Sequence, residues 1–148
     1  MNESKELDLT VGTLTALPRT FTHDGHSFEI KHDRVIRDGR ETCVLISVNY
    51  GGGWSTWCDK LTPFEPAAVL AVLLDRKDAL LTPDSKAFGE QPSDAFRQIL
   101  GVGPGEYIFM GGVRDLVIEY LPIGAAFTIE EYDGNESIRT LADMGYTA

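Results

Sequence analysis

The 148-residue chain has few residues of the kinds that mark several protein classes. Its two cysteines, Cys43 and Cys58, are too few for a disulfide framework and lack the C-x-x-C spacing. Three scattered histidines offer no zinc clip, so we expect no metal and no cofactor. The longest apolar run, residues 67–74, falls far short of the roughly 20 residues that span a bilayer. The first residues also lack the apolar core of a signal peptide. These absences predict a cytoplasmic protein.

Basic residues are also scarce, with 13 Lys and Arg against 23 Asp and Glu and a net charge of −10. This balance argues against direct binding to nucleic acids or anionic membranes, because both would repel the chain. Fourteen of the acidic residues follow residue 60, and eight of these lie in residues 106–143. They form either a hydrated acidic surface or a face for a basic partner protein. The candidate partner-binding residues are Glu119, Glu130, Glu131, Asp133 and Glu136.

The pattern of apolar residues predicts strands at both ends of the chain. Length and a hydrophobic content of 43% are typical of one domain, residues 1–148. Alternation and β-branched residues predict strands over residues 7–16, 28–36 and 42–50, with Asp38-Gly39 as a hairpin turn. The last third predicts strands over residues 106–110, 116–121 and 126–131, and a helical turn or two over 136–144.

Two helices separate these groups of strands. The first is expected to begin at Pro66, to run toward Leu81 and to be stopped by Pro83. The second covers residues 93–100, capped by Ser93 and ended by Gly101. The predicted fold class is α+β: an antiparallel sheet packed against one central helix and one or two short helices.

The most unusual stretch is the octet Tyr50-Gly51-Gly52-Gly53-Trp54-Ser55-Thr56-Trp57, which contains both tryptophans of the chain. Successive glycines let a ligand approach the main chain, exposed N–H groups can cradle an anion, and an indole ring can stack on a flat group. Core packing explains the same residues equally well. The octet is not a P-loop, because G-K-[ST] is missing.

Two cations complete the candidate ligand site. Lys60 follows the octet, and Arg114 follows a second glycine pair, where it could bind a carboxylate or phosphate or could pair with Asp115 at a β-bulge.

Catalysis is a weaker hypothesis than binding of a ligand or of a partner protein. Cys58 could act as a nucleophile with His23, His26 or His32 as its base, but no spacing brings a histidine near it.

The octet, the later Gly111-Gly112-Val113-Arg114-Asp115-Leu116 and the closing Tyr132-Asp133-Gly134-Asn135-Glu136-Ser137-Ile138 resemble a family of small proteins of tailed bacteriophages. In that family a Y-G-x-G-W-S-T-W signature ends a strand, and the similarity covers roughly residues 40–140. Cys58 stands where the family pattern has a polar residue, often Asn, which argues further against a catalytic Cys58. The resemblance implies a protein made in an infected bacterial cell, with no activity to transfer.

Small acidic phage proteins often act by binding, so we expect a non-catalytic counter-defence protein. The first hypothesis is that the octet, with Lys60 and Arg114, sequesters a small anionic, nucleotide-like molecule. The alternative is an acidic inhibitor that binds a host defence protein or nucleic-acid-binding protein. Exposed sheet edges and sites built between subunits make a homo-oligomer plausible.

Overall fold

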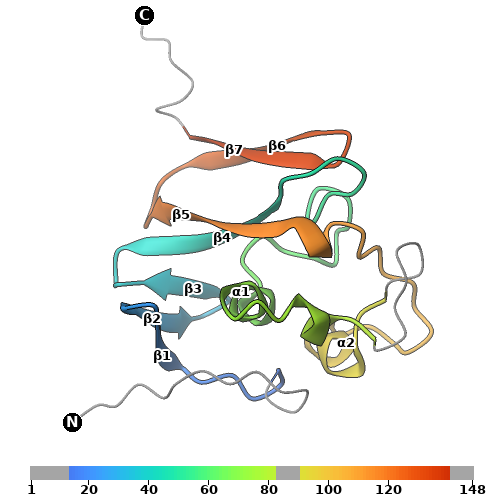
Figure 1. The fold of residues 1–148 in the computed structure, drawn as a ribbon, viewed down its shortest axis with the longest axis horizontal. Helices are drawn as coiled ribbons and strands as arrows, with labels where there is room; N and C mark the ends of the chain where they lie inside the picture. The colour runs from blue at the N-terminus through green and yellow to red at the C-terminus, as the bar shows by residue number, and fades with distance from the viewer. Residues whose placement is uncertain (1–13, 83–90, 141–148) are drawn as a thin grey trace, which may run out of the picture.

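A five-stranded antiparallel sheet dominates the computed structural model, which describes residues 14–82 and 91–140 (Figure 1). Its strands lie in chain order: β1 (Thr20–His23), β2 (His26–Lys31), β3 (Arg34–Arg37), β4 (Glu41–Ser47) and β5 (Leu116–Pro122). A separate two-stranded sheet is formed by β6 (Phe127–Tyr132) and β7 (Asn135–Thr140). Two α-helices, α1 (Pro66–Leu73) and α2 (Asp94–Leu100), complete an α+β fold, so the predicted class is confirmed.

Strand β4 is buried on both faces and lies at the centre of the described structure. Cys43 and Leu45 point into the core that α1 shares, whereas Val44 and Ile46 are buried outside that core. Strand β7 lies against β4, and Figure 1 shows the β6–β7 hairpin on the side of β4 and β5 away from α1. A strand with both faces covered reads as a continuous apolar run, and residues 43–46 form one.

The hairpin turns follow the sequence prediction in one case and depart from it in another. Asp38 and Gly39 both have positive φ, 53° and 67°, in the turn of residues 38–40 that joins β3 to β4, so the predicted turn at Asp38-Gly39 is confirmed. The strand predicted over residues 28–36 is wrong, because the chain reverses at His32, which has a φ of 59°, and forms β2 and β3. Of the strand predicted over residues 7–16, only 14–16 lie within the described residues, and they form a turn and a bend.

Helix α1 begins as predicted but ends earlier. Pro66 is its first residue, and the Glu65 side chain accepts a hydrogen bond from Ala67 N. The helix stops at Leu73, short of the predicted Leu81, because Asp75 adopts a φ of 54°. Asp75 N then bonds Val72 O and Arg76 N bonds Ala71 O, which is the pattern of a Schellman cap. A 3₁₀ turn, η1 (Lys77–Leu80), follows.

Helix α2 has the predicted ends. The Ser93 hydroxyl accepts a hydrogen bond from Phe96 N at 3.2 Å, and Gly101 closes the helix with a φ of 71°. Local capping chemistry decides both boundaries.

The last third contains two corrections. Strands β5 and β6 match the predictions for residues 116–121 and 126–131. Residues 106–110 form no strand; instead the Gln91 side chain bonds both Ile108 N and Ile108 O, as a neighbouring strand would. Residues 135–140 form β7 rather than a helix, and residues 141–144 lie outside the described residues. No helix within residues 14–82 and 91–140 is long and apolar enough to cross a membrane.

Candidate functional site

Three glycine segments that are distant in sequence pack backbone against backbone beside β4. They are residues 51–53, residues 111–112 and Gly134. A Cβ added to Gly52 would lie 2.8 Å from Gly111 C, and one added to Gly112 would lie 2.6 Å from Gly53 O. Gly51 N also donates a hydrogen bond to Asp133 O at 2.8 Å. Gly52, Gly112 and Gly134 therefore permit the close approach of other main chain.

The carboxylate of Glu136, on β7, lies at the centre of this packing and is only 1% exposed. Its Oε1 accepts a hydrogen bond from Ser47 N at 2.8 Å, and its Oε2 accepts hydrogen bonds from Trp54 N at 2.9 Å and Thr56 N at 3.1 Å. The Thr56 hydroxyl donates a further, short hydrogen bond to Oε2. One carboxylate thus ties the end of β4 and two residues of the octet to the β6–β7 hairpin.

Two residues of the octet, Trp54 and Thr56, therefore form an anion cradle together with Ser47 of β4, but the anion is the Glu136 side chain of the same chain. Three backbone N–H groups converging on one carboxylate are the arrangement that the glycine-rich sequence indicates for an external anion. Because Glu136 is buried, its prediction as a partner-binding residue is wrong. Within the described residues, no buried polar side-chain atom lacks a hydrogen-bond partner.

Trp54 belongs to the core and is fully buried. Its Nε1 donates a hydrogen bond to Thr62 O at 2.9 Å, and its ring stacks on Phe96 with the ring centroids 6.4 Å apart. Its prediction as a surface stacking platform is wrong, because neither face of the ring is accessible to a ligand.

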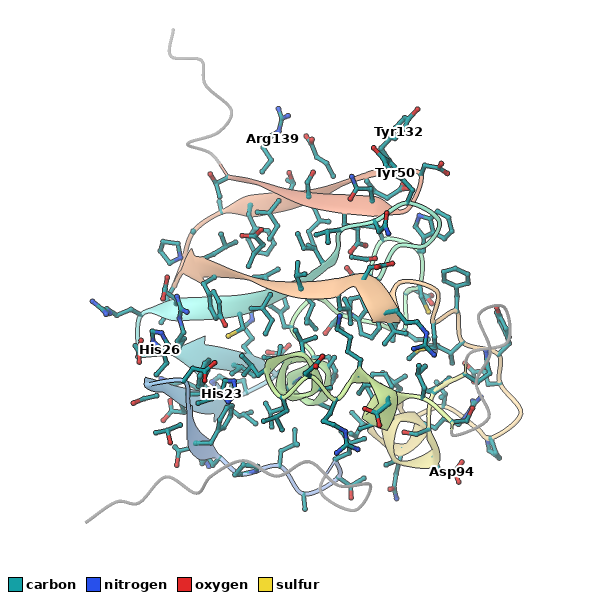
Figure 2. The ribbon with its side chains drawn as sticks, viewed as in Figure 1. His23, His26, Tyr50, Asp94, Tyr132 and Arg139 are labelled. Carbon is teal, nitrogen blue, oxygen red and sulfur yellow. The ribbon has the colours of Figure 1, made fainter. Side chains whose placement is uncertain are left out.

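The other large aromatic residues around the octet remain on the surface. Tyr50 is 62% exposed and Tyr132 is 77% exposed, and their rings meet edge to face with centroids 6.4 Å apart. Figure 2 shows these two side chains together at one edge of the molecule. Trp57, 41% exposed, packs on Phe109 with centroids 5.4 Å apart. We call Tyr50, Trp57, Phe109 and Tyr132 the aromatic surface.

Carboxylates border the aromatic surface at the β6–β7 turn. Glu131 accepts a hydrogen bond from Gly134 N at 2.7 Å, and this bond, together with the nearby Trp57 side chain, lowers the pKa of the Glu131 carboxyl. Glu131 is therefore ionised at neutral pH. Asp133, in the same turn, is exposed. The aromatic surface thus has an acidic border.

The remaining predicted residues do not join a single site. Ser55 is half-buried, and Lys60 is exposed. Arg114 is exposed on a 3₁₀ turn, η2 (Val113–Asp115), rather than at a β-bulge, and its carbonyl accepts a hydrogen bond from Lys77 Nζ. Glu119 is exposed on β5, and Glu130 forms an ion pair with Arg139 across the outer face of the hairpin.

Sequence reasoning missed the pairing of Glu136 with the octet and the contact of Phe109 with Trp57. Glu136 is 80 or more residues from the donors it binds, so no local pattern reports the contact. The Asp133-Gly134 dipeptide was the available signal, because it predicts a hairpin that carries Glu136.

The histidines of the β1–β2 hairpin lie away from the octet. His26 Nδ1 is 2.6 Å from Asp38 Oδ2, and His23 Nε2 is 3.3 Å from Asp24 Oδ2. Figure 2 shows His23 and His26 at the opposite side of the molecule from Tyr50. In the described part of the chain, no cluster of three or more His, Cys, Asp or Glu residues could hold a metal ion.

No protein family matches the chain, and neither a curated protein nor a solved structure is detectably similar to it. The resemblance to tailed-phage proteins therefore stays a prediction from the sequence.

The two free cysteines should differ in reactivity. Burial raises the pKa of the Cys43 thiol to about 12, whereas Cys58 is only half-buried. Since the thiolate is the reactive form, we expect a thiol reagent such as 5,5′-dithiobis(2-nitrobenzoate) to modify Cys58 in the native protein and both cysteines in urea. Mass spectrometry of the modified peptides identifies the residue. Rapid native labelling of Cys43 would contradict its burial in β4.

Proposed function

We propose that this protein acts by binding a basic partner protein through the aromatic surface. The observation that carries the proposal is the exposure of Tyr50, Trp57 and Tyr132 near the ionised carboxylate of Glu131. Tyrosine and tryptophan are enriched among the residues that dominate protein interfaces, and adjoining carboxylates complement a positive patch. The protein's net charge of −10 also attracts a basic partner.

The aromatic surface is also held in place before any partner arrives. Glu136 fixes the N–H groups of Trp54 and Thr56, and Gly51 N is bonded to Asp133 O. Because the segments that carry Tyr50, Trp57 and Tyr132 are already joined, binding would order few additional groups. Such preorganisation lowers the entropic cost of association.

The geometry favours this function over the sequestration of a small anion. The donors that would hold an anion already bind Glu136, and Trp54 cannot stack on a base. An external anion would have to displace a buried carboxylate that accepts four hydrogen bonds. Small acidic phage proteins often act by binding, so, by analogy with them, we propose that the partner is a host protein and that binding it serves counter-defence.

Site-specific photo-crosslinking tests the proposal. A benzoylphenylalanine at position 132 should crosslink a discrete partner in bacterial lysate, and the yield should fall as salt is raised from 50 to roughly 500 mM. The matched control is position 123, because Ile123 is 54% exposed and lies directly after β5, in the connection that leads to β6. The crosslink should disappear when Tyr50 and Trp57 are both replaced by alanine. Equal labelling from positions 132 and 123, or no crosslink from either, would refute the proposal.

A further inference from the structure

The protein packs its own arginines in a manner that suggests what the aromatic surface binds. The Arg37 guanidinium carbon lies 3.4 Å from the centroid of the Tyr120 ring, while Arg37 Nη2 is 2.7 Å from Glu41 Oε1. One guanidinium thus stacks on an aromatic face and pairs with a carboxylate. Arg34 also lies over the Phe64 ring, 3.9 Å from its centroid.

Trp57 and Glu131 offer the same two components, an aromatic ring and a carboxylate, on the surface. Glu131 is paired with Glu136 across the hairpin, and Glu136 binds the N–H of Thr56, the residue before Trp57, so the Glu131 carboxylate and the indole lie close together. The Trp57 side chain accordingly contributes to the lowered pKa of the Glu131 carboxyl. Phe109 packs on Trp57 at an interplanar angle of 38° and limits the movement of the ring. Glu131 keeps acceptor capacity, because a carboxylate can accept about four hydrogen bonds.

We propose that Trp57 and Glu131 hold an arginine side chain of the basic partner, with the guanidinium on the indole face and its N–H groups directed at the carboxylate. This inference rests on the proposed function and names the group that the aromatic surface recognises. Tyr50 and Tyr132 then contact the partner residues that flank the arginine.

Arginine suits this site better than lysine. Its guanidinium is planar and weakly hydrated, so it can stack on a ring and still direct N–H groups at a carboxylate. An ammonium group is compact and strongly hydrated, and it gains less from a flat ring. Tryptophan is also the aromatic residue that binds cations best. A partner segment with arginine should therefore bind more tightly than one with lysine at the same charge.

Peptides of equal charge separate this recognition from general attraction to an acidic protein. We expect hexa-arginine amide to bind about 2- to 5-fold more tightly than hexa-lysine amide at 150 mM salt, as measured by isothermal titration. In a ¹H–¹⁵N spectrum, the indole N–H signal of Trp57 should shift on addition of hexa-arginine, whereas that of the buried Trp54 should not. The chain has only these two tryptophans, so both signals can be assigned by substitution.

Substitutions then test which residues cause the preference for arginine over lysine. Trp57→Ala should bring the affinity ratio between the two peptides close to one, and Trp57→Phe should restore part of it. Glu131→Gln should weaken binding of hexa-arginine. Glu130→Gln is the matched control, because it removes the same charge from a residue that already pairs with Arg139 on the outer face of the hairpin. Circular dichroism checks that each variant is folded.

Three results would overturn the inference: equal affinity of the two peptides for the unmodified protein, an arginine preference that persists in Trp57→Ala, or equal effects of Glu131→Gln and Glu130→Gln. Any of these together with a specific crosslink from position 132 would remove the arginine site and leave the proposed function standing. Loss of the crosslink as well would remove both.

Discussion

Replacing Glu136 with alanine should lower the free energy of unfolding by about 3–5 kcal/mol, because the change leaves the buried N–H groups of Ser47 and Trp54, and the partly buried N–H of Thr56, without an acceptor. Each unsatisfied buried donor costs roughly 1–3 kcal/mol, and removal of a desolvated charge offsets part of the sum. Such a loss is a large share of the ~5–15 kcal/mol that stabilises a typical domain.

Urea denaturation followed by circular dichroism measures this effect. Glu130→Ala is the control, since Glu130 lies on the same hairpin but its ion pair with Arg139 is half-exposed, and we expect a change below about 1 kcal/mol. Glu136→Gln keeps one acceptor oxygen but directs an NH₂ group at an N–H donor, so its stability should fall between that of Glu136→Ala and that of the unmodified protein. A loss under about 1 kcal/mol for Glu136→Ala would show that the octet does not depend on this carboxylate.

The two tryptophans should respond very differently to truncation. Trp54→Ala removes a fully buried ring that stacks on Phe96 and leaves Thr62 O without its donor, so we expect a loss of about 3–5 kcal/mol. Trp57→Ala removes a ring that is 41% exposed, and we expect a loss of about 1 kcal/mol or less.

The pair makes its own control, because the same substitution is made twice, three residues apart. Chemical denaturation compares stability, and the crosslink from position 132 compares binding. Trp57→Ala should weaken the crosslink without unfolding the protein, whereas Trp54→Ala should lose both together. Similar stabilities for the two variants would contradict the placement of Trp54 in the core.

Local chemistry made part of the fold predictable. Asp38-Gly39 and the Ser93 and Gly101 caps of α2 are decided by residues within one turn, and the sequence predicted all of them correctly. The early end of α1 was missed because Asp75 is a residue that tolerates positive φ without requiring it. Strand β7 was missed because Glu136, the residue that anchors it, bonds to residues 80 or more positions away.

The sequence predicted where the candidate site lies but not which groups its N–H donors bind. Glycines and tryptophans identified residues 50–57 as unusual, and their N–H groups do surround a carboxylate. Sequence could not show that this carboxylate belongs to Glu136, nor which tryptophan faces solvent. Trp54 and Thr56 are two residues apart but have different surroundings. The Trp54 ring lies in the core, whereas the Thr56 hydroxyl bonds Glu136.

The position of Glu136 near the end of the described chain has a consequence for synthesis on the ribosome. Tyr50 and Trp57 are translated long before β7, yet the loop that carries them is anchored by a residue on that last strand. A nascent chain that has not yet released residues 135–140 from the exit tunnel lacks the anchor and also lacks the docked hairpin. Competence to bind a partner should therefore arise only after β7 has left the exit tunnel, which protects shorter nascent chains from unproductive complexes.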